Sequence, residues 1–377
     1  MSDLKFIFCT NFYDNVSNGP AKFARIITKF GGENVLIITE DAIFNSNSIR
    51  SVPRPATWAK TSLLTQGYRN LAFAQGLSHL PLVGKEPIVF NNIINTFMVR
   101  SRFTNPIIGF INDDNNLPSR LSGQYSLASM QRRILGKMER AAAKRVDGVV
   151  VNSRYLAEKV TREYELSPDK VHLLYKGTNL KDINFRPRTP SSSGPINILF
   201  VKSDFRRGGL LELMEAIRFI DRVVHLHVIG PTQKAIEVAT GRLVKSIENL
   251  NVHCHGKQPP EFVNARLMKT DIACLPSHFE ALGVFNMEAM AHGVPVVTSG
   301  VGGIPEVTDG GKNCWEVDPS DPYSIAEGIT ATWTRRDETM IKVSNARDYI
   351  TAHFSEDHAF RRLEEIIQLV KSNVRFE

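Results

Sequence analysis

The segment from Pro276 to Pro295 concentrates chemically useful residues, with two glutamates on either side of a glycine. A buried strand is predicted to end where this segment begins, and a short helix to begin near Asn286, with Gly283 in the turn between them. Backbone N–H groups at such a turn bind anions. Because carboxylates repel phosphate, Glu280 and Glu288 would contact neutral hydroxyl groups, as on a ribose or a hexose. The alternative is a capped core helix with two solvated glutamates.

Three other turns could also approach a ligand. Arg206 and Arg207 precede two glycines in a loop after a predicted strand, an arrangement suited to clamping a diphosphate. The glycine-rich turn at 300–306 would let the backbone come close to a ligand. In the first half, Gly19 opens a helix after the first strand, which is again the geometry of an anion site. Paired arginines are also common on protein surfaces, so alone they indicate little.

These turns need a frame that positions them, and the sequence predicts an α/β one. Continuously apolar runs alternate with helical periodicity, which indicates parallel sheets covered on both faces. The predicted strands are 5–9, 34–39, 87–90, 106–111, 146–151, 196–201, 224–229, 271–275 and 295–298. The Pro- and Ser-rich stretch 186–195 is typical of a linker. We therefore predict two doubly wound domains, 1–185 and 186–355, facing each other across a ligand-binding cleft. An amphipathic helix within 356–377 would pack back on the first domain.

Composition and charge exclude several classes of protein. Hydrophobic residues make up 42% and charged residues 23%, which is globular, and no apolar run is long enough to span a membrane. Four cysteines without paired spacing and the lack of a leader peptide favour a cytoplasmic location. Residues 1–190 hold 26 Lys and Arg against 15 Asp and Glu, whereas the remainder holds 20 against 24. The basic half could contact an anionic membrane or phosphorylated ligands, or be only a solubilising surface.

Two further patterns can be explained either by a function or by an ordinary structural role. Basic residues recur at three-and-four spacing in a predicted helix near 132–145, so they could face an anionic membrane or only solvent. Without interleaved aromatic residues, nucleic acid is not an expected partner. Histidines alternate at 225 and 227 in the predicted strand 224–229, and at 253 and 255 in a further strand-like stretch. With no further ligand near either pair, a structural role is favoured over a metal site.

Together the motifs of the C-terminal half resemble the retaining glycosyltransferases of family four, which have the GT-B fold. Seven residues separate the two glutamates, as in that family's signature, and their context is Pro276-Ser-His-Phe-Glu-Ala-Leu-Gly and Glu288-Ala-Met-Ala-His-Gly-Val-Pro-Val-Val297. Further stretches that look like family features are Gly302–Glu306, Asp309–Asn313, Val151–Leu156 and Tyr175–Asn179. The resemblance covers most of the chain and is strongest from about 146 to 330.

The resemblance implies an enzyme that moves a hexose from a nucleotide-diphosphate sugar to a hydroxyl of a glycan, lipid-linked or small-molecule acceptor, with retention of configuration. Glu288 would bind the ribose hydroxyls of the donor, and Glu280 would contact the hydroxyls of its sugar. Arg206 or Arg207 would neutralise the diphosphate as it leaves. With that charge held by the protein, no metal or other cofactor is expected.

Further donor contacts and the acceptor side follow from the same resemblance. Backbone amides would approach the sugar and phosphates at Gly19, Gly283, Val284, Phe285 and Asn286. The family commonly ends a first-half strand with His-Asp, where this chain has Asn112-Asp113-Asp114, so Asp113 is the candidate for hydrogen bonding to the acceptor. Independently of the resemblance, the segments 91–95 and 112–116 are further candidates for facing the acceptor, because polar residues end predicted strands there. Lys202-Ser203 stands where the family usually has Gly-Arg, which leaves open which arginine clamps the diphosphate.

Two other functions stay open on the sequence alone. A nucleotide-sugar epimerase or a sugar-phosphate synthase could share the same fold, and an epimerase would interconvert free donor without an acceptor. A non-catalytic, two-lobed sugar-binding protein would have no need of Glu280. Such a protein would also be expected to carry an export signal. A cytoplasmic location, with peripheral contact at the inner face of the membrane, fits the transferase.

Overall fold

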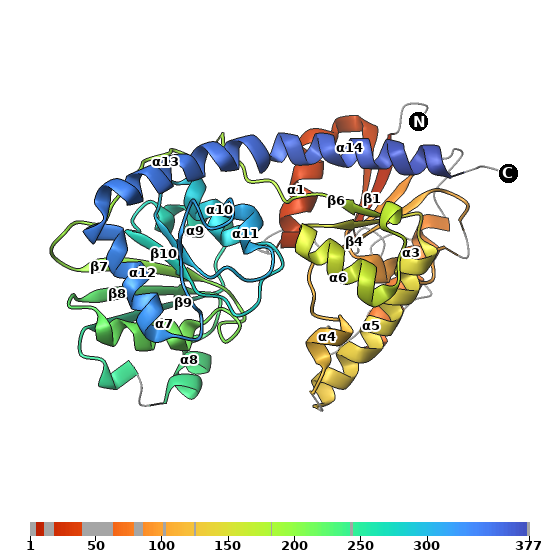
Figure 1. The fold of residues 1–377 in the computed structure, drawn as a ribbon. Helices are drawn as coiled ribbons and strands as arrows, with labels where there is room; N and C mark the ends of the chain where they lie inside the picture. The colour runs from red at the N-terminus through yellow and green to blue at the C-terminus, as the bar shows by residue number, and fades with distance from the viewer. Residues whose placement is uncertain are drawn as a thin grey trace. The chain divides into compact units, whose positions relative to one another are not determined.

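The computed structural model describes residues 5–10, 19–39, 63–78, 86–100, 103–123, 126–181, 183–241 and 244–374. The chain divides into two compact units (Figure 1). The first comprises Met1–Gly177 together with Asp357–Glu377, and the second comprises Thr178–Glu356. Each unit is built on its own parallel sheet, so each has a complete hydrophobic interior of its own.

Within the described residues, the first unit has a six-stranded parallel sheet in the order β2-β1-β3-β4-β5-β6. The strands are β1 (Phe6–Thr10), β2 (Val35–Thr39), β3 (Ile88–Phe90), β4 (Ile107–Ile111), β5 (Gly148–Val151) and β6 (Val171–Leu173). Strands β1, β3, β4 and β5 are buried along their whole length. Continuous apolar runs therefore mark strands with helices on both faces, as the sequence predicts.

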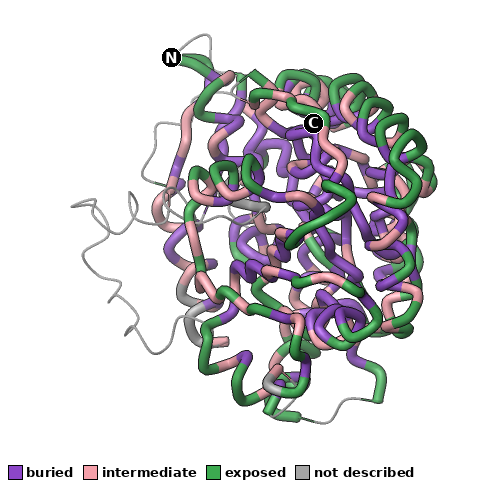
Figure 2. The backbone as a smooth tube through the Cα atoms, turned by 90° about the vertical axis from the view of Figure 1, so that its left-hand side faces the viewer, coloured by how far each residue is buried: buried purple, intermediate pink, exposed green. Residues whose placement is uncertain are grey.

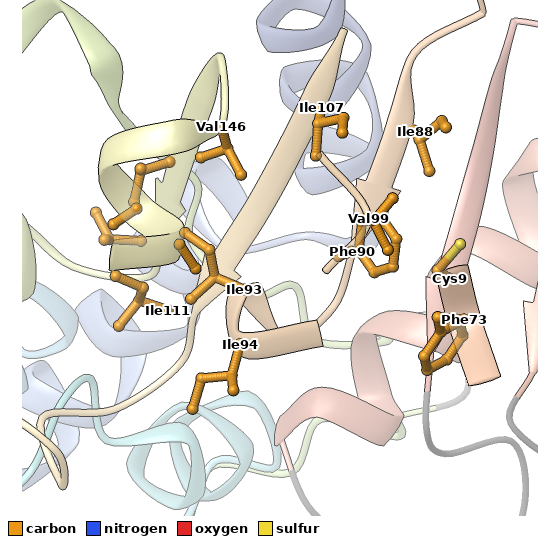
Figure 3. Packing of buried hydrophobic residues seen from close by; sticks show 14 of the residues in the cluster. Cys9, Phe73, Ile88, Phe90, Ile93, Ile94, Val99, Ile107, Ile111 and Val146 are labelled. Carbon is orange, nitrogen blue, oxygen red and sulfur yellow. The ribbon is translucent and has the colours of Figure 1, made fainter. Parts of the chain in front are cut away.

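Helices cover both faces because the side chains of each strand alternate between them. In β1, Phe6 and Phe8 join one core with α1 (Gly19–Gly31) and α14 (Glu356–Asn373). Ile7 and Cys9 join the other, part of which Figure 3 shows, with α3 (Leu63–Ser78), α5 (Leu127–Arg145) and α6 (Arg154–Tyr164). Shorter segments are η1 (Gly32–Asn34), η4 (Ile93–Thr96), α4 (Pro118–Leu121) and η5 (Pro168–Lys170). Buried and exposed residues also alternate along the helices, because one face of each helix packs against the interior (Figure 2).

The second unit has a parallel sheet in the order β12-β11-β10-β7-β8-β9. Its strands are β7 (Ile196–Val201), β8 (Val224–Ile229), β9 (Leu250–Gly256), β10 (Ile272–Leu275), β11 (Val296–Thr298) and β12 (Trp315–Glu316). From β7 the chain proceeds outward in one direction, and from β10 it proceeds in the other. Strands β7 and β10 are neighbours, with Ile198 opposite Ile272. The topological switch point, where doubly wound sheets bind ligands, thus lies between these two strands.

The helices of the second unit begin where the sequence supplies caps or a turn. They are α7 (Leu210–Ala216), η6 (Ile217–Phe219), α8 (Gln233–Thr240), η7 (Val244–Ser246), α9 (Pro260–Leu267), α10 (Val284–Ala291), α11 (Ile304–Val307), α12 (Pro322–Thr334) and α13 (Arg336–His353). The side chains of Thr232 and Asp321 accept hydrogen bonds from the first turns of α8 and α12. Helix α7 continues directly into the 3-10 turn η6.

The boundary between the units differs from the predicted one at 185. The Pro- and Ser-rich stretch 186–195 lies within the second unit and is bonded to it. The backbone N–H of Arg188 donates to the carbonyl of Gly293 at 3.0 Å, and its Nη1 reaches the carbonyl oxygens of Leu267 and Thr270 at 2.6 and 3.1 Å. Prolines and serines therefore mark an extended segment here, because hydrogen bonds to a neighbouring surface hold it in place.

Candidate active site

Two loops meet at the switch point of the second sheet. One follows β7 and carries Arg206 and Arg207, and the other follows β10 and carries Glu280. The backbone N–H of His278 in the second loop donates to the carbonyl of Arg207 in the first, at 2.9 Å. The Arg207 guanidinium lies 5.8 Å from the centroid of the Phe279 ring. The fold therefore brings Arg207 next to the loop that carries Glu280.

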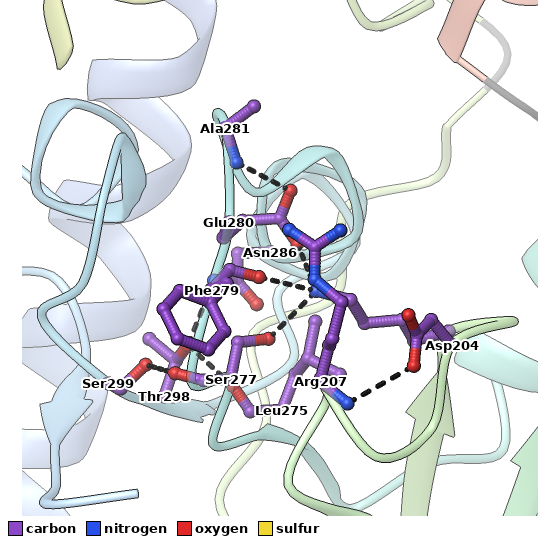
Figure 4. Close-up of polar contacts among 11 residues, drawn as sticks. Asp204, Arg207, Leu275, Ser277, Phe279, Glu280, Ala281, Asn286, Thr298 and Ser299 are labelled. Carbon is purple, nitrogen blue, oxygen red and sulfur yellow. Dashed lines mark hydrogen bonds and ion pairs between the residues drawn. The ribbon is translucent and has the colours of Figure 1, made fainter. Parts of the chain in front are cut away.

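Buried polar side chains anchor the loop after β10 from below (Figure 4). Ser299 Oγ donates to the carbonyl of Ser277 at 2.6 Å, and Thr298 Oγ1 donates to that of Leu275 at 2.8 Å. The amide nitrogen of Asn286 donates to Thr298 Oγ1 at 3.0 Å. The Asn286 side chain is therefore part of the packed interior, and only its backbone can approach a ligand.

The predicted donor-binding glycine turn forms the start of α10. Gly283 precedes this helix with φ 94°, a left-handed conformation that favours glycine. Val284, Phe285 and Asn286 form the first turn, whose N–H groups have no carbonyl partner within the helix. Phe285 is buried, so here too the backbone is the part that remains for a ligand. Glu288 lies one turn further along α10 and is half-buried.

Hydrogen bonds hold both the backbone and the side chain of Glu280. Its carbonyl oxygen accepts from the N–H of Gly303 at 3.1 Å, and its Oε1 accepts from the N–H of Ala281 at 3.1 Å. At Gly302, with φ 62°, an added Cβ would lie 1.9 Å from the Glu280 carbonyl oxygen. The close backbone approach predicted for the glycine-rich turn is therefore made, at Gly302, to the loop that carries Glu280.

Sequence reasoning gave Lys202 no role, but the structure places it beside Glu280. Its Nζ lies 2.7 Å from Glu280 Oε2, 3.2 Å from Ser277 Oγ and 3.0 Å from the Phe279 carbonyl oxygen. The signal in the sequence was a lysine directly after a buried strand. Its partner is 78 residues away along the chain, so no local pattern could reveal the contact.

The two arginines differ in how they are held. The Arg207 side chain is half-buried, and its backbone N–H donates to Asp204 Oδ1 at 3.3 Å. Arg206 is exposed, with its guanidinium 5.7 Å from the centroid of the Phe205 ring. The loop is therefore fixed more firmly at Arg207, the arginine next to the Glu280 loop.

In the first unit the ends of the strands carry amides. Asn91 Nδ2 donates to Thr10 Oγ1 at 3.1 Å, and Asn112 Nδ2 donates to the carbonyl of Asn91 at 2.7 Å. Asn152 Nδ2 continues the series to the carbonyl of Asn112 at 2.8 Å. The predicted segments at 91–95 and 112–116 are therefore joined through a row of side-chain amides.

The remaining predicted site residues also belong to the first unit. Gly19 is the first residue of α1, and the residues just before it, 11–18, lie outside the described part of the chain. Asp113 is exposed, and its Oδ1 accepts from the N–H of Asn115 at 2.9 Å. Asp114 is buried and pairs with Arg120 at 3.3 Å. Of the two adjacent acids, Asp113 is the one that solvent can reach.

The four strand histidines are closer together than their sequence positions suggest. Because β8 and β9 are neighbours, His225 Nδ1 lies 3.3 Å from His253 Nε2, and His227 Nδ1 lies 3.2 Å from His255 Nε2. Burial and the nearby Arg266 lower the pKa of His227 to about 4. Among the described residues, no group of three or more His, Cys, Asp and Glu side chains is arranged to hold a metal ion.

The fold and this site define a class of protein. Two doubly wound, parallel-sheet units have the GT-B architecture, and the second presents its polar loops at the switch point of its sheet. Residues 195–335 match the model of the family described as glycosyl transferases group 1. The matched residues all lie within the second unit.

Individual proteins agree with this class. The chain is 24% identical over 289 residues to the putative colanic acid biosynthesis glycosyltransferase WcaL of Salmonella typhimurium, covering 66% of this chain and 69% of that protein. The structure of a sucrose-phosphate synthase from Thermosynechococcus elongatus matches with a TM-score of 0.74 and 18% identity, over 98% of this chain and 100% of that one. Anabaena HepE in complex with UDP and glucose matches with a TM-score of 0.68 and 13% identity, over 97% and 99%. Two further curated relatives are matched over only 60% and 46% of their own length.

Proposed function

We propose that this chain is a retaining glycosyltransferase that moves a hexose from a nucleoside-diphosphate sugar to a hydroxyl of a glycan, lipid-linked or small-molecule acceptor. The observation that carries the proposal is the meeting of Arg207, Glu280 and the start of α10 at one switch point. Guanidinium and backbone N–H groups suit a diphosphate, and carboxylates suit sugar hydroxyls. The UDP and glucose in HepE support the donor class, and the polysaccharide named for WcaL supports a glycan acceptor.

In this proposal the residues of the second unit share the work of binding the donor. Glu288 accepts hydrogen bonds from the ribose hydroxyls, and Glu280 accepts them from the sugar. Arg206 or Arg207 balances the charge that develops as the bond between the anomeric carbon and the diphosphate oxygen breaks. The acceptor hydroxyl attacks from the same face and passes its proton to the departing phosphate. Since the arginines supply the positive charge, we propose that no divalent metal is needed.

The first unit supplies the acceptor side in the same proposal. Asp113 accepts a hydrogen bond from the acceptor hydroxyl, supported by its exposure to solvent. The amide side chains at Asn91 and Asn112 offer donors and acceptors to further hydroxyls. The N–H of Gly19, at the first residue of α1, approaches the donor phosphate.

Calorimetry with UDP-glucose, UDP-N-acetylglucosamine, GDP-mannose and ADP-glucose, with and without magnesium, tests the donor site. We expect one of them to bind equally well with or without the metal. Glu288→Ala should weaken that binding roughly 10- to 100-fold, as for lost hydrogen bonds to a charged group. The matched control is Glu261→Ala, at an exposed position of α9. If none of the four binds, the transferase proposal fails.

Transfer itself is measured with the donor that binds. Radiolabelled sugar should pass to a sugar, sugar-phosphate or polyprenyl-phosphate acceptor with its anomeric configuration kept. Interconversion of the donor in the absence of any acceptor would instead indicate an epimerase. Transfer confined to a sugar phosphate would indicate a sugar-phosphate synthase.

We also propose that the first unit contacts an anionic membrane through α5, which would bring a lipid-linked acceptor within reach. This helix carries six Lys and Arg residues and one acid, Glu139, which is buried. On its outer face Leu127, Met130 and Ile134 are 74, 57 and 47% exposed. An apolar stripe beside cationic side chains suits the boundary between lipid headgroups and acyl chains. No helix in the described ranges is long and apolar enough to cross a membrane.

Sedimentation with vesicles tests this contact. The protein should bind vesicles of phosphatidylglycerol, bind phosphatidylcholine weakly, and lose part of its affinity in high salt. Replacing Leu127, Met130 and Ile134 together with Gln should abolish sedimentation. The matched control replaces three apolar residues that are exposed on other helices, Val238, Ile341 and Leu369. Equal binding by both triple variants would refute the role of α5.

A further inference from the structure

Lys202 is the cation closest to Glu280 among the contacts described above, and it is anchored at both ends. Its backbone N–H donates to the carbonyl of Ile229 in β8 at 3.0 Å. Its ammonium has three N–H donors, and three oxygens lie within 3.2 Å, from Glu280, Ser277 and Phe279. The side chain is only 16% exposed. The donors of this ammonium are therefore taken up by the protein itself.

The contact with Lys202 fixes the second carboxylate oxygen of Glu280, Oε2. The Glu280 backbone is held by Gly303, and its Oε1 is held by the N–H of Ala281. Only Oε2 is left to set the rotation of the carboxylate, and this is the oxygen that Lys202 binds at 2.7 Å. Because both groups are largely shielded from water, with side chains 16 and 22% exposed, the pair is screened less than a surface ion pair.

We infer that Lys202 is a positioning residue that orients the Glu280 carboxylate toward the donor sugar, and that it is not a ligand of the diphosphate. The inference rests on the proposed function, because it assigns a purpose to the orientation of Glu280. Lysine stands here where the resembling family usually has glycine, so the inference concerns this chain's own residue. The diphosphate is left to the arginine loop, whose guanidinium groups can bind it with two hydrogen bonds.

A double-mutant cycle tests the inference, using the donor identified by calorimetry and its nucleoside diphosphate. Lys202→Met should lower kcat roughly 10- to 100-fold, with the affinity for the nucleoside diphosphate changed less than about threefold. In the Glu280→Gln background the same substitution should change kcat less than about threefold, since the carboxylate it orients is gone. Lys202→Arg should recover part of the rate because it keeps the charge. Lys234→Met, at an exposed position of α8, is the matched control.

Amide hydrogen exchange of the free protein provides a readout without any donor. Lys202→Met should speed exchange in the peptide that contains the Ala281 N–H and leave the rest of the second unit unchanged. If the wild type transfers no sugar, the proposed function fails, while the exchange experiment still reports on the contact. The inference is overturned if Lys202→Met lowers kcat by the same factor with and without the Glu280 carboxylate. It is also overturned if Lys202→Met weakens binding of the nucleoside diphosphate tenfold while kcat stays unchanged. Unchanged exchange at Ala281 would overturn it too.

Discussion

The carboxyl edges of the two sheets have the same parallel-strand frame and opposite chemistry. At the second sheet the loops carry charge, with the Lys202–Glu280 pair and Arg207 beside it. At the first sheet the strand ends are joined by neutral groups, Thr10, Asn91, Asn112 and Asn152. Cations suit a diphosphate, whereas amides offer both donors and acceptors to uncharged hydroxyls. In the proposed function, the charged edge binds the diphosphate and the amide row binds the hydroxyls of the acceptor.

The largest expected effect comes from removing a charge at the edge of the second sheet. Glu280→Gln should lower kcat about a hundredfold or more while nucleotide affinity stays nearly constant, because we place Glu280 against the reacting sugar. Asn112→Ala, at the neutral edge, should leave nucleotide affinity unchanged and raise the KM for the acceptor. Steady-state kinetics with both substrates varied measures each effect. If Asn112→Ala lowered the nucleotide affinity, the two edges would not differ in the ligand that they bind.

The second prediction concerns Glu139, a buried carboxyl beside the first edge whose pKa is raised. Burial raises the pKa of Glu139 to about 7, and its oxygens accept from Tyr164 Oη at 2.6 Å and Asn116 Nδ2 at 3.0 Å. In the unfolded chain the pKa returns to about 4.3. The folded state therefore binds the proton more tightly, and stability is lost as pH rises from about 4 to about 7.

Urea unfolding between pH 4 and pH 8 measures this loss. The wild type should lose on the order of 3 kcal/mol across the range relative to Glu139→Gln, which cannot ionise. Free energies of unfolding that run parallel with pH for the two proteins would show that folding leaves the pKa of Glu139 unchanged.

The third prediction separates the two arginines of the charged edge. Arg207→Ala should weaken binding of the nucleoside diphosphate about tenfold, because a guanidinium held next to the Glu280 loop is already placed for the phosphates. Arg206→Ala, one residue away and exposed, is the matched control and should cost less than about threefold. Calorimetry at two salt concentrations checks both. The reverse order would assign the clamp to Arg206.

The last prediction is a pH dependence of opposite sign in the second unit. The pKa of His227, lowered to about 4, compares with about 6.5 in the unfolded chain. The unfolded state therefore takes up the proton first, and stability is lost as pH falls from about 6.5 toward 4. Urea unfolding of the wild type and of His227→Gln should diverge over this range. No divergence would mean that folding leaves the pKa of His227 unchanged.

Much of the second unit and its site followed from local patterns. The spacing of Glu280 and Glu288, the glycine before α10 and the strand from 224 to 229 all depend on residues close together in the sequence. The boundary between the units lies between Gly177 and Thr178, whereas the sequence predicted it at 185. Composition cannot tell a free linker from an extended segment. Hydrogen bonds of Arg188 to Leu267 and Thr270, about 80 residues away, decide that question.

By itself the sequence determined that the chain is α/β, where most of its strands lie, and which turns carry acids, arginines and glycines. Periodicity and turn chemistry depend on residues close together in the chain, so they can be recognised without knowing the fold. Only the tertiary structure decided that β7 lies beside β10, and hence that Lys202 meets Glu280. It also decided that β8 lies beside β9, and hence that four histidines form a row. The order of strands in a sheet is set by packing between distant segments, and no local pattern encodes it.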